Sequence, residues 1–195
     1  MISKIKGTID ELKPTEVILD VQGVGYGLTI PLSTYEKIQA SSEVALHVYT
    51  HHKEDNLKLF GFYTEEEKNI FIILLNVSGI GPAMAISILS GITIGRLIEA
   101  VKTENPALLT KIPGIGKAKA EKLIFELRRR QKKLAQYAGK AEEQYANTMS
   151  NDAVEALVNL GFDESRSSRV VEDIIKNNPA CTIEYIIKES LKSLT

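Results

Sequence analysis

The feature that most constrains the fold is a repeated segment, in which two Gly-Ile-Gly motifs lie 35 residues apart. Residues 77–90 read VSGIGPAMAISILS and residues 112–125 read IPGIGKAKAEKLIF, so that the glycines and several apolar residues align. Glycine permits sharp backbone turns, and the apolar residues around the motifs recur at helical spacing. The repeat therefore predicts two units, each a helix, a tight hairpin and a second helix.

Each hairpin is a candidate site for an anion held by the backbone. The glycines, Gly79 and Gly81 in one repeat and Gly114 and Gly116 in the other, allow close approach to another surface. Amides at the start of the following helix point outward with the positive end of its dipole, an arrangement that suits phosphate. Positive side chains follow the second hairpin: Lys117, Lys119 and Lys122. A plain turn beside solvated lysines is the alternative, and two hairpins in register disfavour it.

Positive charge is concentrated in the segment that contains the hairpins. The formal net charge is -1, but residues 1–62 carry -2, residues 63–140 carry +6 and residues 141–195 carry -5. This distribution predicts a modular protein with one electropositive face. The run Arg128–Arg130 adds to that charge. Three successive helical positions point in three directions, however, so a solvated helix end explains this run equally well.

The first third of the chain is expected to form a barrel. β-branched and aromatic runs, broken by glycine and proline, begin with Ile2, Ile5 and Ile9 and continue at 17–21, 26–30, 44–50 and 57–62. Five short strands in residues 1–63 favour an OB-like barrel, which closes its edges at this size. Gly23, Gly25 and Gly27 open no helix, so they indicate a hairpin or barrel bend rather than a dinucleotide loop.

The rest of the chain is expected to be helical, which gives an α+β multidomain protein. Thr64 and Glu67 form a capping-box pattern that opens a tandem helix-hairpin-helix domain over residues 64–135. Helices are expected to start at Pro82 and to cover 97–101, 106–111 and 117 to about 134. Residues 136–150 have the composition of a flexible linker. Residues 151–195 regain helical periodicity and predict a three-helix bundle, with Gly161 ending its first helix.

Several chemistries are excluded or disfavoured. No P-loop motif occurs, so ATP hydrolysis would belong to another protein. The single cysteine, Cys181, rules out an internal disulfide. His47, His51 and His52 lack the ligand spacing of a zinc site, so we expect no metal and no cofactor. No stretch approaches the roughly 20 apolar residues of a membrane span and no signal peptide is evident, which predicts a cytoplasmic protein without membrane contact.

The order of these modules resembles that of the bacterial RuvA family, the Holliday junction-binding components of branch migration complexes, over essentially the whole chain. The local matches are GVGY at 23–26, LFGF at 59–62, SGIGPAMAISILSG at 78–91 and PGIGKAKAEKL at 113–123. The resemblance implies a homotetramer, or two tetramers, that clasps a four-way DNA junction in an open form. It also implies a hexameric RuvB-type ATPase recruited by the C-terminal domain, and a RuvC-type resolvase as a further partner.

The resemblance changes the interpretation of one loop and exposes one departure. By itself, the segment 51–56 is a solvated hairpin loop, but the family implies that Glu54 and Asp55 form an acidic pin, whose carboxylates repel phosphates at the crossover. Family members often carry a basic residue after the first hairpin, whereas Ala83 and Met84 stand here.

Two other functions stay open at this point. One is a base-excision glycosylase or a nuclease, because helix-hairpin-helix pairs occur in both. The other is a protein adaptor that binds its main ligand through the C-terminal bundle.

Overall fold

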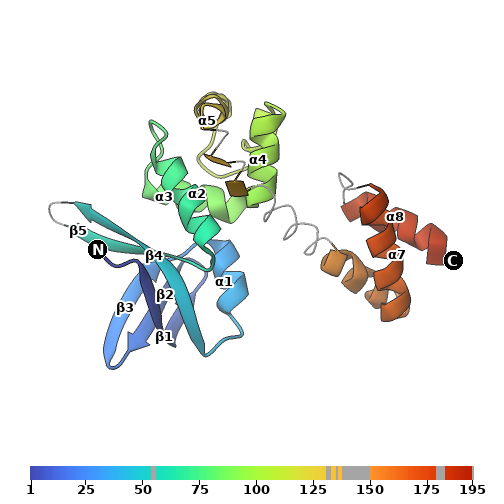
Figure 1. Cartoon of the computed structure of the whole chain (residues 1–195), viewed down its shortest axis with the longest axis horizontal. Coiled ribbons are helices and arrows are strands. Elements are labelled where there is room, and N and C mark those ends of the chain that lie inside the picture. The colour runs from blue at the N-terminus through green and yellow to red at the C-terminus, as the bar shows by residue number, and fades with distance from the viewer. Residues whose placement is uncertain (54–55, 131–132, 135, 138–149, 179–182, 195) are drawn as a thin grey trace. The chain divides into compact units, whose positions relative to one another are not determined.

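The computed structural model describes all residues except 54–55, 131–132, 135, 138–149, 179–182 and 195 (Figure 1). The chain divides into two compact units, residues 1–138 and 139–195. The linker expected at 136–150 falls mostly outside the described residues, as do Glu54, Asp55 and Cys181.

Five strands of the first unit form a closed barrel. They are β1 (Lys4–Lys13), β2 (Glu16–Val21), β3 (Val24–Thr29), β4 (Glu43–Lys53) and β5 (Asn56–Phe62), in the order β1-β2-β3-β5-β4. All neighbours pair antiparallel except β3 and β5, which run parallel. Alternate residues such as Val17 and Leu19 are buried, so one face of each strand fills the interior. The predicted OB-like barrel is confirmed.

Gly23, Gly25 and Gly27 belong to the β2–β3 hairpin, with Gly23 in the turn and the other two in β3. Gln22 (φ 55°) and Gly23 (φ 86°) form a two-residue loop between the paired residues Val21 and Val24. Positive φ at both loop positions is the requirement of a type I′ turn, whose twist matches that of the strands. Asp20 Oδ1 accepts a hydrogen bond from Gly23 N at 2.9 Å and holds the turn. The interpretation as a hairpin is confirmed.

One helix of the barrel was not predicted. Helix α1 (Leu32–Ile38) lies between β3 and β4, and its Ile38 is fully buried in the barrel core. The helix has seven residues, and Pro31 at its N-cap makes no side-chain capping bond. Such a short helix has almost no stability of its own and forms because Ile38 packs against the strands, which local sequence patterns do not reveal.

The helical half of the first unit follows the barrel directly. It contains α2 (Glu65–Leu75), α3 (Pro82–Gly91), α4 (Ile94–Lys102), a 3-10 turn η1 (Pro106–Leu108) and α5 (Lys117–Arg128). Pro82 occupies the first position of α3, as expected.

Two expected helices are shorter than predicted. Residues 106–111 contain only η1, which Asn105 caps through the amide of Ala107 at 3.1 Å. Helix α5 ends at Arg128 rather than near Leu134. Arg130 turns back there and donates to the carbonyl of Glu126 at 2.8 Å, which satisfies one of the last-turn acceptors that a helix leaves open.

None of the described helices taken singly is long and apolar enough to cross a membrane. The pair α3 and α4, bent by 96°, meets the length and composition criteria only when both helices are combined.

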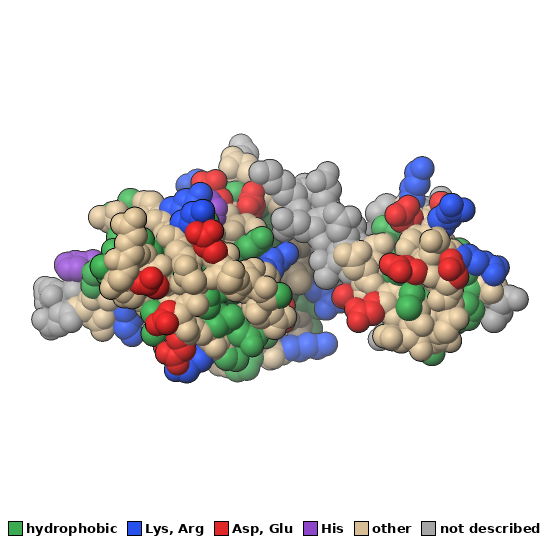
Figure 2. Space-filling view, turned by 90° about the horizontal axis from the view of Figure 1, so that it is seen from below, with side chains coloured by type: hydrophobic (Ala, Val, Ile, Leu, Met, Phe, Trp, Pro, Cys, Tyr) green, Lys and Arg blue, Asp and Glu red, His purple; other side chains and the backbone are tan. Residues whose placement is uncertain are grey.

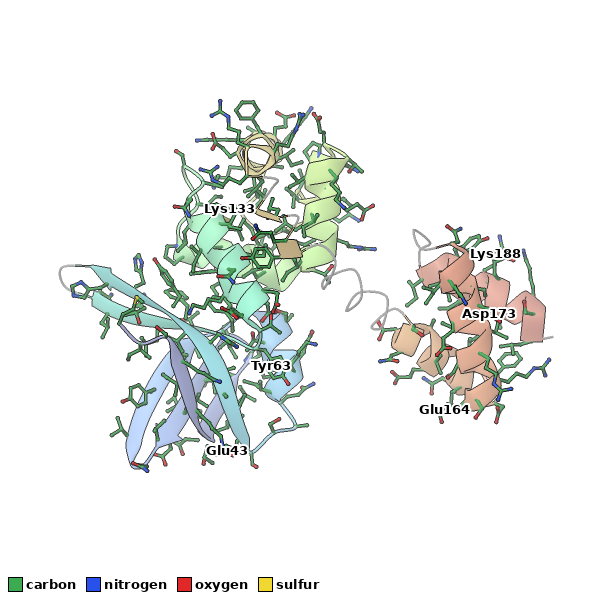
Figure 3. All side chains as sticks on the ribbon, viewed as in Figure 1. Glu43, Tyr63, Lys133, Glu164, Asp173 and Lys188 are labelled. Atoms are coloured by element: carbon green, nitrogen blue, oxygen red, sulfur yellow. The ribbon has the colours of Figure 1, made fainter. Side chains whose placement is uncertain are left out.

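Glu67 joins the barrel to the helical half. Its side chain is 7% exposed and accepts hydrogen bonds from Ser33 Oγ at 2.6 Å and Thr34 Oγ1 at 3.0 Å, both at the start of α1. It also accepts from the amide of Tyr63 at 3.2 Å, where β5 passes into α2 (Figure 3). Thr64 caps α2 by accepting from Glu67 N at 3.2 Å. This is one of the two hydrogen bonds of the predicted capping box. The carboxylate of Glu67 accepts from α1 and from the Tyr63 amide, not from the Thr64 amide that a capping box would use.

The described residues of the second unit form a bundle of three helices, at 150–159, α7 (Glu164–Asn177) and α8 (Ile183–Leu194). Its core comprises Ala153, Leu157, Val171, Ile186 and Leu194. Gly161 has φ 95°, its amide donates to Val158 O at 2.9 Å, and the amide of Phe162 donates to Leu157 O at 3.1 Å. This is the Schellman arrangement that Gly161 predicted.

Replacing Glu67 with alanine should destabilise the first unit. The change removes the acceptor of the Ser33 and Thr34 hydroxyls and one of the two acceptors of the Tyr63 amide, which also donates to Thr34 Oγ1 at 3.0 Å. The loss should lower the free energy of unfolding by about 2 to 3 kcal/mol. Urea unfolding of the full chain and hydrogen exchange of the Tyr63 amide measure the effect. Glu65→Ala, in the same helical turn but exposed, is the matched control and should cost less than about 1 kcal/mol. Equal effects of the two variants would contradict the proposed link.

Candidate nucleic-acid interface

The two hairpins have nearly the same backbone conformation. Gly79 and Gly114 have φ values of 90° and 83°. Gly81 and Gly116 are the N-caps of α3 and α5, with φ, ψ of -93°, 176° and -82°, 172°. The 35-residue repeat of the sequence is therefore a repeat of structure, and both predicted hairpins are present.

Matching hydrogen bonds close the two turns. The amide of Ile80 donates to Val77 O at 3.0 Å, and the amide of Ile115 donates to Ile112 O at 3.0 Å. A bond between the first and fourth residues, with positive φ at the third, is the pattern of a type II turn. Glycine is the residue that takes that third position without strain. This requirement explains Gly79 and Gly114.

The central isoleucine anchors each hairpin in the core. Ile80 is 8% exposed and Ile115 is 4% exposed, whereas the glycines on either side of them are exposed. Because the side chain points inward, the turn presents its backbone to the outside. The helix that follows each hairpin is also anchored in the core, by the fully buried Ala85 in α3 and Ala120 in α5.

The second glycine of each motif has no explanation within the chain. Gly81 and Gly116 have φ values that any residue adopts, and a Cβ placed on either would meet no atom within 4 Å. Serine, aspartate or asparagine would cap the helix better, because glycine has no side chain to accept from the first-turn amides. A ligand that approaches the backbone closely accounts for glycine at both positions. An anion is the ligand that these open amides favour.

The lysines after the second hairpin supply charge to both hairpins. Lys117 is exposed and forms no hydrogen bond or ion pair with the described part of the chain. Lys119 Nζ lies 3.3 Å from Gly114 O, at its own hairpin. Lys122 Nζ lies 3.3 Å from Ser78 Oγ and so reaches the first hairpin from α5. The first hairpin, which lacks a basic residue of its own, thus receives charge from the second repeat.

The contacts of Met84 explain why no basic residue follows the first hairpin. It is equivalent in the repeat to Lys119, and it packs across onto the second hairpin: a Cβ placed on Gly114 would lie 3.1 Å from Met84 Cε. The two hairpins therefore contact each other reciprocally, through Met84 in one direction and Lys122 in the other. The sequence alone did not reveal this contact or the part played by Ser78, because both join residues far apart in the chain.

The arginine run at the end of α5 is engaged within the protein. Arg128 pairs with Glu104 at 2.6 Å, while Arg129 and Arg130 approach Glu126 at 4.0 and 3.0 Å. Arg130 is only 29% exposed in its side chain. The structure therefore favours a third role for this run, in holding α5 through ion pairs, which neither interpretation from the sequence included.

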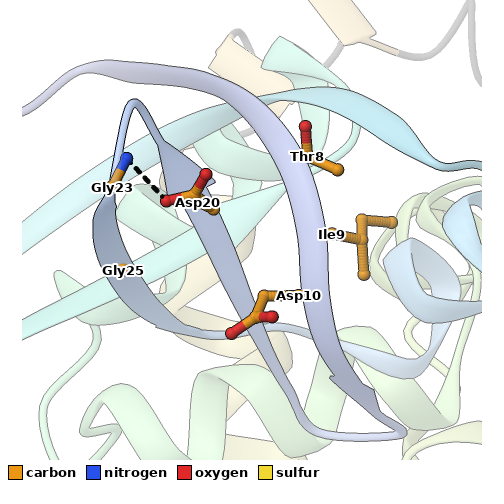
Figure 4. A pocket seen from close by; sticks show the side chains of 6 residues that line it. All are labelled: Thr8, Ile9, Asp10, Asp20, Gly23 and Gly25. Atoms are coloured by element: carbon orange, nitrogen blue, oxygen red, sulfur yellow. Dashed lines mark hydrogen bonds between the residues drawn. The ribbon is translucent and has the colours of Figure 1, made fainter.

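A hollow on the barrel has the opposite electrostatic character. Its lining residues are Thr8, Ile9, Asp10, Asp20, Gly23 and Gly25, and its volume is about 380 Å³ (Figure 4). One of its two carboxylates, Asp20, holds the β2–β3 turn. Two carboxylates repel phosphate, so this hollow does not suit a phosphate group. Across the described residues, no group of three or more His, Cys, Asp or Glu side chains is arranged to hold a metal ion.

Family models match three successive parts of the chain. The RuvA N-terminal domain matches residues 1–61, a SAM-like helix-hairpin-helix tandem matches residues 71–129, and the RuvA C-terminal domain matches residues 148–195. The tandem model covers both Gly-Ile-Gly hairpins.

Curated relatives align over the full length. The chain is 43% identical to a protein of Syntrophotalea carbinolica and 42% identical to one of Geotalea daltonii, and in both cases the alignment covers 100% of this chain and 99% of the relative. It is 33% identical to a protein of Shewanella sediminis, with both chains covered completely. Each relative is named Holliday junction branch migration complex subunit RuvA.

Alanine substitutions should separate the two kinds of glycine. Gly81→Ala and Gly116→Ala have permitted backbone angles and free space, so the melting temperature should hold while affinity for DNA falls, because the methyl group stands where the phosphate approaches. Gly79→Ala and Gly114→Ala should lower stability by about 1 kcal/mol or more, because alanine is strained at positive φ. Thermal unfolding and fluorescence anisotropy with labelled DNA test both parts. Unchanged DNA affinity of Gly81→Ala/Gly116→Ala would contradict close backbone approach.

Proposed function

The chain belongs to the RuvA family of Holliday junction branch migration complex subunits, and from this membership we propose that it binds four-way DNA junctions in recombination and repair. In this role it holds the junction open without reading base sequence. The observation that carries the proposal is the pair of matching hairpins, whose exposed glycine backbones lie beside Lys117, Lys119 and Lys122. Backbone amides and lysine ammonium groups contact phosphates, which position DNA but carry no sequence information.

We propose a division of labour along the chain. Residues 1–63 assemble subunits into a homotetramer, or into a pair of tetramers, and present the acidic pin. Residues 64–135 grip the DNA through Gly79, Gly81, Gly114 and Gly116 together with the three lysines. Residues 136–150 tether the C-terminal domain, residues 151–195, which recruits the motor. The net charge of -5 in residues 141–195 supports this part, because an acidic segment suits a protein partner better than DNA.

The pin is proposed from the family and from the strands that carry it. Glu54 and Asp55 connect β4 and β5, which pair with each other as far as Lys53 and Asn56. Carboxylates at this point would repel the phosphates of strands that meet at the crossover and keep them apart.

We further propose that the protein is not catalytic and acts in the cytoplasm. ATP hydrolysis belongs to a hexameric RuvB-type partner, and junction cleavage to a RuvC-type resolvase. The absence of a Gly-x-x-x-x-Gly-Lys-Ser/Thr motif from the sequence supports the first assignment.

Removing the three lysines should weaken the dependence of junction binding on salt. Each lysine that neutralises a phosphate contributes about 0.9 to the slope of log affinity against log salt concentration. Lys117→Ala/Lys119→Ala/Lys122→Ala should therefore flatten the slope measured with a labelled four-way junction. Lys176→Ala/Lys188→Ala/Lys192→Ala removes the same charge from the C-terminal unit and is the matched control. An unchanged slope in the first variant, or an equal loss in the second, would place the DNA elsewhere.

A further inference from the structure

Strands β4 and β5 extend beyond the barrel as a two-stranded arm. Toward the β4–β5 turn, the last residue of β4 that pairs with β1 is His47. The last residue of β5 in that direction that pairs with β3 is Leu59. Residues 2 and 3 continue alongside β4, where Ser3 O accepts from Val48 N and Ile2 exchanges hydrogen bonds with Thr50 Oγ1. Beyond Thr50, the ladder joins only β4 and β5, and we call residues 51–53 and 56–58 the β4–β5 arm. Figure 1 shows the two strands projecting from the barrel on the side from which α2 and α3 rise.

The face of the arm that turns toward the helical half can be identified from its base. Tyr49 and Phe60 are cross-strand partners, and their rings pack against Phe71 of α2 with centroids 5.4 and 5.2 Å apart. Side chains of directly paired residues lie on one face, and the pattern repeats every second residue. The next pair on this face is His51 with Lys58.

The other face of the arm carries a different pair. His52 and Leu57 are cross-strand partners, and Leu57 is 60% exposed. Each face thus has one histidine, but only His51 shares its face with a cation of the opposite strand and with the rings that pack on α2.

The imidazole of His51 is held in place by its neighbours. Its ring stacks on Tyr49 with centroids 6.3 Å apart and meets the edge of Phe60 at 6.3 Å. The ring is half-buried, whereas Lys58 is exposed. Histidine side chains lie at the molecular surface in Figure 2. A fixed ring beside a lysine forms a small cationic site when the imidazole is protonated.

Few acids face this site from the described residues. On the described part of the strands, the titratable groups that share its face are His47, the phenol of Tyr49 and Lys58, and positions 51–53 and 56–58 contain no Asp or Glu in sequence. Helix α2 carries charge only at Glu65, Glu66, Glu67 and Lys68. Glu67 is bound to Ser33 and Thr34. The turn residues Glu54 and Asp55 lie outside the described part, so a separate variant is needed to test them.

We propose that His51, as an imidazolium, and Lys58 bind a phosphate of the DNA backbone where a junction strand passes the β4–β5 arm. The inference rests on the proposed function, to which it adds a contact outside the hairpins. Helix α2 leads from this face to the first hairpin, and its 11 residues span about 16 Å. A duplex held at the hairpin is therefore within reach of the arm.

Because the contact requires a protonated imidazole, it should make the affinity for the junction depend on pH. Histidine is the side chain whose charge changes near neutral pH, and its imidazolium form offers two N–H donors instead of one. A unit charge about 4 Å from a phosphate contributes about fivefold in affinity in a water-like dielectric. Junction binding should consequently tighten as the pH falls toward about 6.

The test compares variants of the full chain at two pH values. Affinity for a fluorescein-labelled immobile four-way junction is measured near pH 6 and near pH 8.5 at constant ionic strength. The wild type should bind about fivefold or more tightly at the lower pH. His51→Phe keeps the ring contacts without a titratable nitrogen, and His51→Gln keeps a polar side chain; both should lose most of the difference in affinity between the two pH values. His52→Phe, on the opposite face, is the matched control and should retain the gain.

Each other outcome has a defined meaning. A full pH gain in both His51 variants would overturn the inference, and so would its loss in His52→Phe. Glu54→Gln/Asp55→Asn should keep the gain, because carboxyl groups of model peptides titrate near roughly pH 4, below the range of the test. Loss of the gain in this variant would assign the effect to the turn instead. Equal binding of junction and linear duplex at both pH values would contradict the proposed function, and the same comparison of His51 variants on duplex would then decide the inference separately.

Discussion

The structure depends on the Gly-Ile-Gly motif, in which the only side chain is buried and the backbone is exposed. In each Gly-Ile-Gly motif the isoleucine is buried in the core, while the flanking glycines lie at the surface. Positive φ at Gly79 and Gly114 allows the chain to reverse direction within each turn, at residues 77–80 and 112–115. Burial of the isoleucine fixes the turn, and the fixed turn aims the first amides of α3 and α5 outward, where they favour an anion.

The two hairpins have similar backbones, but their repeats contribute different side chains to the site. The second repeat carries the charge, since Lys119 lies at its own hairpin and Lys122 reaches Ser78 of the first. The first repeat carries the packing, since Met84 contacts Gly114. A lysine at position 84 could not make that apolar contact, so the departure from the family pattern is compatible with two working hairpins.

The barrel and the helices are coupled by polar as well as apolar contacts. Glu67 links the first turn of α2 to Ser33 and Thr34 of α1, and Phe71 of the same helix packs against Tyr49 and Phe60. Helix α2 therefore fixes the direction of the β4–β5 arm relative to the first hairpin. In a protein that holds several DNA strands at once, this coupling would keep the contacts in register.

Local patterns predicted much of this architecture, and their failures have physical causes. Runs of β-branched and aromatic residues, broken by glycine and proline, predicted all five strands. Glycine placement predicted both hairpins and the end of the helix at 150–159. Helix α1 escaped prediction because its stability comes from burying Ile38 in the barrel. The partners of Glu67, Met84 and Lys122 also escaped, because sequence spacing says nothing about contacts between residues about 30 or more positions apart.

The central claim is that two equivalent backbone sites hold DNA irrespective of sequence. Hydrogen exchange of the segments 78–86 and 113–121 tests it most directly, with and without four-way junctions of two unrelated sequences, because exchange reports the opening and covering of individual amides. The account predicts that both segments become protected, and to the same extent with either junction. Protection confined to one segment, or dependent on the sequence of the junction, would contradict it.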